Sequence, residues 1–212
     1  MKSDQIDTII FDVGGVLCQF PWQAQARKLG LSEPVIYELE TNPTFKKLWA
    51  QYDLANVPYE ELHETYIRVL PEYVEELRLF IDNVDKCFRA FDYTLSLIRS
   101  LKNEGYHLFV LSNLTPFLYE GAMQRGDFEF VKYLDGAFFS YQINLMKPDP
   151  VFYKKLVEEY RIDPERTVYI DDVFQNTVPA ETLGMKTILF KGYDKLIEEF
   201  SKLEIFAINL SC

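Results

Sequence analysis

The sequence predicts an α/β fold, a doubly wound, Rossmann-like parallel sheet with helices on both faces. Five short apolar runs have the character of strands, at residues 6–11, 106–111, 137–140, 167–170 and 186–190. They are nearly continuous rather than alternating, as expected of parallel strands buried on both faces. Helical patterns lie between the later runs, and this alternation of strand and helix defines the fold class.

The helices between the strands carry their own end signals. Glycine closes the helical stretches 92–105 and 177–184, while Asp149 and Pro150 supply an N-cap and a first helical residue for another helix. The amphipathic stretch 195–210 is expected to pack on the core.

One region breaks the alternation. Residues 18–91 show no convincing strand, only helical segments with aromatic stripes, and such stripes are usually core. Three prolines stand where helices could start, namely Pro34, Pro58 and Pro71. We therefore expect a discontinuous α/β core, residues 1–17 plus 92–212, interrupted by a helical domain at 18–91.

Composition narrows the class of protein. The net charge of −11 argues against a nucleic-acid or anionic-membrane surface, and an anionic substrate would need a local positive centre. The three cysteines are far apart and odd in number, so neither a disulfide framework nor a zinc site is expected, and a reducing cytoplasm fits best. No secretory signal or membrane-spanning run is apparent. The oligomeric state is left open.

Polar side chains gather where the predicted strands end. They are Asp12 after the first strand, Ser112 and Asn113 after the second, Asp171 and Asp172 after the fourth, and Lys147 at the mouth of a helix. Ligands of open α/β sheets bind at the carboxyl ends of strands, so these groups are expected to share one site.

This set of side chains suits phosphoryl transfer. A pair of carboxylates from two strands makes a hard oxygen site of the kind that Mg²⁺ prefers. Ser112, Asn113 and Lys147 can donate to phosphate oxygens.

Asp12 is the candidate nucleophile. A carboxylate beside a bound cation stays ionised at neutral pH and can attack phosphorus, giving an aspartyl-phosphate. Gly14 and Gly15 follow it and let the backbone approach metal and phosphate closely.

Four motifs in order carry a family resemblance. "FDVGGVL", "LSN", "MKPDP" and "YIDD" resemble the motifs of the haloacid dehalogenase superfamily. The wider wording of residues 146–190 resembles its phosphatase branch, including sugar-phosphate phosphatases and the phosphatase domain of soluble epoxide hydrolases. The insertion at 18–91 lies where that branch places its cap domain.

The resemblance implies a role for each motif residue. Asp12 would be nucleophile and Mg²⁺ ligand, with the carbonyl of Gly14 and the carboxylate of Asp172 as further ligands. Ser112 and Asn113 would bind the phosphoryl group, and Lys147 would neutralise it and position Asp12. Asp171 and Gly15 would be supporting neighbours, and Asn176 stands where many relatives keep another acid.

One position departs from the pattern. Phosphatases of the family usually carry a second aspartate two residues after the nucleophile, as general acid and base, and this chain has Gly14 there. General acid–base help is worth roughly 10²–10⁴-fold. Leaving groups that depart readily, such as an anomeric sugar phosphate, would depend on the acid less.

The expected function is a Mg²⁺-dependent phosphatase for a small phosphorylated metabolite, with a sugar phosphate as one candidate. The first alternative is a catalytically weak or inactive phosphate-binding or interaction module, which Gly14 favours. A phospho-accepting receiver domain usually has its paired acids after the first strand, whereas here they follow the fourth. A dehalogenase would share the aspartate nucleophile but would not need a metal-binding Asp172.

Overall fold

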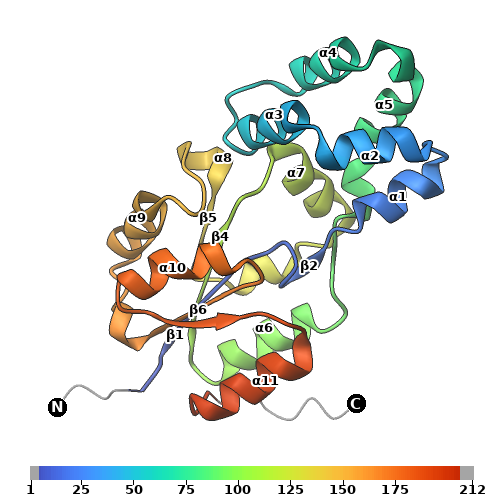
Figure 1. The fold of residues 1–212 in the computed structure, drawn as a ribbon. Coiled ribbons are helices and arrows are strands. Elements are labelled where there is room, and N and C mark those ends of the chain that lie inside the picture. Colours follow the sequence, from blue (N-terminus) through green and yellow to red (C-terminus); the bar gives the residue numbers. More distant parts are fainter. Residues whose placement is uncertain (1–4, 206–212) are drawn as a thin grey trace.

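The protein is built around a parallel sheet of five strands in the order β5-β4-β1-β6-β7, in a computed structural model that describes residues 5–205 (Figure 1). The strands are β1 (Thr8–Phe11), β4 (His107–Ser112), β5 (Gly136–Phe139), β6 (Thr167–Asp171) and β7 (Lys186–Leu189). The predicted doubly wound α/β class is confirmed. The strand ends differ slightly from the expected ones, because Ser112 and Asp171 are the last residues of their strands rather than the first residues beyond them.

The register of the central strand determines which side chains meet at the carboxyl edge. Phe11 of β1 pairs with Val110 on one side and with Ile170 on the other. The next residue, Asp12, therefore lies level with Asp171, and Ser112 is one residue further along β4. The edge thus brings together residues that are far apart in the sequence.

Helices cover both faces of the sheet. The core contains α6 (Thr94–Asn103), α7 (Pro116–Arg125), α8 (Ser140–Ile143), α9 (Pro150–Tyr160), α10 (Phe174–Thr182) and α11 (Tyr193–Lys202). Residues of α6 and α11 share one apolar cluster with the sheet, and residues of α9 and α10 share another. Because alternate residues of a strand point to opposite faces, Ile9 and Ile10 belong to different clusters.

The predicted end signals are present in the structure. The Asp149 side chain accepts from the backbone N–H of Val151 at 2.9 Å and caps α9, whose first residue is Pro150. Glycines with left-handed φ angles of 92° and 94° follow α6 and α10. The amphipathic tail forms α11, and its predicted extension over 206–210 lies outside the described residues.

Five further helices lie together beyond the carboxyl ends of the strands (Figure 1). They are α1 (Trp22–Leu29), α2 (Glu33–Thr41), α3 (Pro43–Asp53), α4 (Tyr59–Val69) and α5 (Val74–Ile81), and they enclose an apolar cluster of their own. Of the marked prolines, Pro34 lies in the first turn of α2, Pro58 precedes α4, and Pro71 opens a short 3₁₀ helix. We refer to residues 18–91 as the cap, a division that we propose.

The expectation of no strand in this region is wrong at its two ends. Cys18–Gln19 (β2) and Arg89–Ala90 (β3) form an antiparallel pair where the chain enters and leaves the cap. Two residues are too few to show a strand periodicity, so the sequence pattern could not reveal them. Among the helices of the described chain, none has both the length and the apolar character needed to cross a bilayer.

Arg125, at the end of α7, ties the core to the segment that leaves the cap. Its guanidinium donates to Asp85 Oδ2 at 2.6 Å, to the carbonyls of Asp85 and Phe88 at 2.9 and 3.0 Å, and to Asp127 Oδ2 at 2.9 Å. Gly121 leaves room for this contact, since a Cβ there would lie 2.5 Å from Asp85 Oδ2.

Arg125→Met should lower the free energy of unfolding by about 3 kcal/mol, because it leaves two largely buried carboxylates without their donor. Urea unfolding followed by circular dichroism measures the loss. Arg78→Met is the matched control, since Arg78 makes only an exposed pair with Glu75 at 3.8 Å and its loss should change stability little. Equal effects of the two changes would show that the Arg125 contact is not a structural tie.

Candidate active site

Lys147 lies at the centre of the carboxyl edge, between two aspartates. Its Nζ is 2.8 Å from Asp12 Oδ1 and 2.7 Å from Asp171 Oδ2. The three residues are 3%, 6% and 0% exposed. Burial by itself would lower the pKa of Lys147, but the charges of Asp12 and Asp171 outweigh it and raise the pKa. The lysine is therefore charged at neutral pH.

The pKa of Asp12 results from opposing effects of burial and neighbouring charges. Burial raises its pKa to about 6, the charge of Lys147 opposes that rise, and the charge of Asp171 adds to it. The backbone N–H of Val13 donates to Asp12 Oδ1 at 2.6 Å. With its pKa about one unit below neutral, Asp12 is mostly ionised there, as a nucleophile must be.

Asp171 has its hydrogen-bonding capacity filled by the protein. It accepts from Lys147, from the hydroxyl of Tyr169, from the Val173 backbone at 2.8 Å and from Asn176 Nδ2 at 3.0 Å. An amide at position 176 can donate to Asp171, which an ionised acid could not do. Asp171 and Asn176 therefore contact each other beside Lys147, and a supporting role for the two residues stays a prediction.

Asp172 differs from its neighbour in being exposed. Burial of its carboxyl and the charge of Asp171 raise its pKa, and Lys147 partly offsets this. Carboxylate oxygens of Asp12, Asp171 and Asp172 lie within 4.8 Å of one another. Since Asp171 is already committed to donors, Asp172 and Asp12 are the carboxylates best placed to take an ion.

The two glycines after Asp12 serve different purposes. Gly15 has a left-handed φ of 76°, and a Cβ there would lie 2.2 Å from Asp172 Oδ2. A Cβ on Gly14 would meet nothing within 4 Å. The close approach that requires glycine is therefore at Gly15, whereas Gly14 leaves an open space at the position where a general acid was expected.

Ser112 and Asn113 take unequal parts. Ser112 is buried at the end of β4, and its hydrogen bond lowers the pKa of Asp12, against the larger effect of burial. The side chain of Asn113 instead holds the Lys147 main chain, accepting from its N–H at 2.8 Å and donating to its carbonyl at 3.1 Å. A donation from Asn113 to a phosphoryl group is left to the second Nδ2–H or to the backbone N–H.

Two tyrosines behind the site were not predicted from the sequence. The hydroxyl of Tyr169 donates to Asp171, and the hydroxyl of Tyr153 donates to the Asn176 carbonyl at 2.8 Å. Tyr169 was available from the pattern, because residues two apart on a strand share a face and Tyr169 stands two before Asp171.

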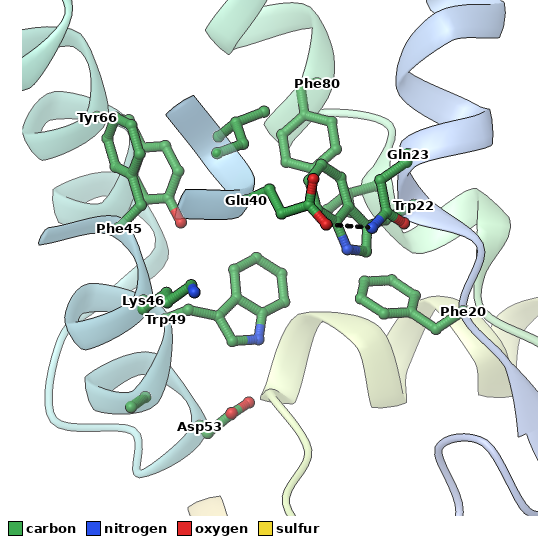
Figure 2. A pocket seen from close by; sticks show the side chains of 13 residues that line it. Phe20, Trp22, Gln23, Glu40, Phe45, Lys46, Trp49, Asp53, Tyr66 and Phe80 are labelled. Carbon is green, nitrogen blue, oxygen red and sulfur yellow. Dashed lines mark hydrogen bonds between the residues drawn. The ribbon is translucent and has the colours of Figure 1, made fainter. Parts of the chain in front are cut away.

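A cavity of about 420 Å³ lies in the cap (Figure 2). We call it the cap cavity, and its lining is aromatic and aliphatic with four polar residues: Phe20, Trp22, Gln23, Leu39, Glu40, Phe45, Lys46, Trp49, Ala50, Asp53, Tyr66, Phe80 and Val84. Asp53 is the last residue of α3. Burial raises the pKa of Asp53 to about 8, so its carboxyl is largely uncharged at neutral pH.

The acidic cluster fits a divalent metal. Hard carboxylate oxygens from three aspartates face a single lysine, which leaves the cluster an excess of negative charge. The bare backbone at Gly15 allows Asp172 to lie against it. The donor set suits Mg²⁺, which takes few protein ligands and keeps several waters.

Comparison with known proteins identifies the class. Residues 6–180 match the model of the haloacid dehalogenase-like hydrolase family. The chain belongs to the haloacid dehalogenase-like hydrolases, and the resemblance seen in the four motifs is confirmed. The receiver-domain alternative loses its support.

Similar proteins include phosphatases. The chain is 26% identical to D-ribitol-5-phosphate phosphatase of Bacteroides thetaiotaomicron, over 86% of this chain and 90% of that protein. It is 25% identical to sesquiterpene phosphatase astK of Aspergillus oryzae, over 83% of this chain and 85% of that protein. It is also 25% identical to bifunctional epoxide hydrolase 2 of Sus scrofa, matching 92% of this chain but spanning only 38% of that protein.

Solved structures share the fold. The had family enzyme bt-2542 of Bacteroides thetaiotaomicron, in complex with magnesium and inorganic phosphate, superposes with a TM-score of 0.74 at 22% identity, covering 91% of this chain and 98% of that one. A dehalogenase in an intermediate complex superposes with a TM-score of 0.69 at 17% identity, covering 98% and 100%. The fold alone therefore does not separate phosphatase from dehalogenase chemistry.

Gly15→Ala should weaken Mg²⁺ binding by about tenfold or more, because the Cβ of the alanine would displace the Asp172 carboxylate. Isothermal titration with Mg²⁺ measures the affinity. The adjacent Gly14→Ala is the matched control and should bind Mg²⁺ as the unaltered protein does, since its Cβ meets nothing within 4 Å. Equal Mg²⁺ affinities in the two variants would show that the contact between Gly15 and Asp172 is not needed for Mg²⁺ binding.

Asp53→Asn should stabilise the protein by an amount that grows with pH. Asp53 ionises near 3.8 when unfolded and at about 8 when folded, so between these values the unfolded chain has lost a proton that the folded chain retains. Stability of the unaltered protein therefore falls as pH rises through this window, and the asparagine variant does not share that fall. Melting temperatures of both proteins at several pH values across the window provide the test. A difference that does not depend on pH would show that Asp53 ionises normally.

Proposed function

We propose that this protein is a Mg²⁺-dependent phosphatase that hydrolyses the monoester of a small phosphorylated metabolite through an aspartyl-phosphate on Asp12. The observation that carries the proposal is the buried arrangement at the carboxyl edge, in which Lys147 bridges Asp12 and Asp171 beside an exposed Asp172.

The charges of the site explain why a cation is needed. One lysine cannot offset a phosphate and the neighbouring aspartates together. Asp12, the carbonyl of Gly14 and Asp172 would hold Mg²⁺, which supplies positive charge beside the phosphoryl oxygens when bound.

Bond formation falls to Asp12. A carboxylate oxygen of Asp12 attacks phosphorus, the bond from phosphorus to the ester oxygen breaks, and the alcohol leaves after gaining a proton. The ammonium of Lys147 keeps Asp12 ionised and would offset the charge of the phosphoryl group. The Ser112 hydroxyl, which is hydrogen-bonded to Asp12, would donate to a phosphoryl oxygen. Water then hydrolyses the acyl phosphate and restores the carboxylate.

The proton for the leaving alcohol has no donor at position 14. The open space at Gly14 holds no side chain, so this proton comes from water or from another group. Substrates with good leaving groups are therefore expected to react faster than simple alkyl phosphates.

Similarity supports this function. Two of the relatives described above carry phosphatase names and match most of this chain. Their substrates, a pentitol phosphate and a sesquiterpene phosphate by name, differ in polarity, so the similarity supports the reaction and leaves the alcohol portion open.

Two alternatives remain. Gly14 favours a module that binds phosphate without turnover, whereas the intact Asp12–Lys147 pair favours an enzyme. The dehalogenase alternative has the shared fold in its favour, but it gives no reason for the exposed acid at Asp172.

Asp12→Asn should reduce Mg²⁺-dependent release of phosphate from p-nitrophenyl phosphate by on the order of 10³-fold or more, because an amide is a poor nucleophile. A stopped assay for free phosphate measures the rate, and a melting curve checks that the variant folds. If the folded variant keeps a tenth or more of the rate, as an order of magnitude, Asp12 is not the nucleophile. An unaltered protein that binds phosphate without releasing any from esters would favour the binding module.

Asp172→Ala and Asp171→Ala should fail in different ways. Asp172 is exposed, so its loss should raise the Mg²⁺ concentration needed for half-maximal rate by about tenfold or more without lowering stability. Asp171 is fully buried among donors, so its loss should cost about 3 kcal/mol of stability. Magnesium titrations and urea unfolding separate the two effects. The reverse outcome would exchange the roles of the paired acids.

A further inference from the structure

The cap cavity is attached to both loops that carry the proposed catalytic groups. On one side Phe20 follows β2 closely, and Cys18 of β2 accepts from Gly15 N–H at 2.8 Å, three residues beyond Asp12. On the other side the Ser140 hydroxyl donates to the Asp53 carbonyl at 2.5 Å and accepts from Leu114 N–H at 3.0 Å, two residues beyond Ser112. These contacts join the lining of the cavity to the loops that follow β1 and β4.

The walls of the cavity are rings that pack on one another. Phe45 stacks on Tyr66 with ring centres 4.4 Å apart. Trp22 meets Phe80 edge-on at 5.8 Å. Trp49 lies near the middle of the lining, as Figure 2 shows, and its ring centre is 6.3 Å from that of Phe20. Because each ring is held by another, the apolar surface is formed before any ligand arrives.

Polar side chains make up four of the thirteen lining residues, and three of them are hydrogen-bonded or exposed. Gln23 donates to Glu40 at 3.5 Å, and Glu40 and Lys46 are exposed. Asp53 also lines the cavity, and its carboxyl is largely neutral at neutral pH. A polyol would have to leave hydroxyls without partners against the rings, which costs free energy for each one.

We propose that the cap cavity selects phosphate monoesters whose alcohol portion is an apolar body, either an aryl group or a branched hydrocarbon chain, over those of polyols. The volume of about 420 Å³ is within the range of cavities that enclose a small organic ligand. This inference deepens the proposed phosphatase function and rests on it.

The test compares primary alkyl phosphates, so that leaving-group chemistry is nearly constant. The apolar arms are 2-(1-naphthyl)ethyl phosphate and 3,7-dimethyloctyl phosphate, and the polyol arm is ribitol 5-phosphate. We expect kcat/KM to be at least about tenfold higher for one or both apolar esters, as burial of several methylene groups would give. Whichever apolar arm is faster identifies ring or chain as the favoured body. A polyol ester that reacts as fast as both apolar ones overturns the proposal.

Variants locate the selectivity in the cavity. Trp49→Ala should reduce the ratio of apolar to polyol kcat/KM by about tenfold. Tyr37→Ala, an exposed aromatic of the cap outside the cavity, is the matched control and should leave the ratio unchanged. Ala50→Trp should fill the cavity and reduce the ratio without removing any core side chain, which covers the case that Trp49→Ala fails to fold. A ratio unaffected by both cavity variants overturns the proposal.

A binding measurement separates this inference from the phosphatase proposal. The non-hydrolysable 2-(1-naphthyl)ethylphosphonate is titrated calorimetrically into the unaltered protein with Mg²⁺, beside methylphosphonate. Tighter binding of the naphthyl compound that Ala50→Trp abolishes supports the cavity even if no ester is hydrolysed, in which case only the phosphatase function fails. Equal binding of the two phosphonates, with hydrolysis of p-nitrophenyl phosphate intact, sinks the cavity proposal alone.

Discussion

The position of Lys147 between Asp12 and Asp171 is the constraint on which the rest of the site depends. A buried ammonium would lose its charge without carboxylates beside it, and two buried carboxylates would repel each other without the ammonium. The charge of Lys147 lowers the pKa of Asp12, and the charges of Asp12 and Asp171 raise the pKa of Lys147. Neighbouring residues hold these three side chains in place. Asn113 hydrogen-bonds the Lys147 main chain, and Tyr169, Asn176 and the Val173 backbone N–H donate to the Asp171 carboxylate.

The sequence allowed the sheet and the residues of its carboxyl edge to be predicted because both depend on local pattern. Continuous apolar runs marked the strands, and polar residues at their ends marked the site. What distinguishes Asp171 from Asp172 is not local. The two acids are adjacent and identical in type, and only the packing of Tyr169 and Asn176 around the first shows that it is engaged while the second is exposed.

In the cap, even more of the structure depends on contacts between distant residues and could not be predicted from the sequence. Its helices and proline starts could be predicted, but β2 and β3 form only because distant segments meet. The cap cavity draws residues from Phe20 to Val84, and no spacing rule links such positions. The raised pKa of Asp53 likewise arises from tertiary burial, which leaves no mark in the residues around it.

The hydrogen bonds at the end of α3 bear on how the cap can move. The cap joins the core through β2 and β3 and through the contacts of Arg125, and it is attached again where Ser140 and Asn144 donate to the Asp53 and Leu54 carbonyls at 2.5 and 2.8 Å. Any displacement of the cap away from α8 would have to break these two hydrogen bonds. Since Ser140 also accepts from the Leu114 N–H, two residues beyond Ser112, a displacement of the cap at this point would disturb the loop that follows β4.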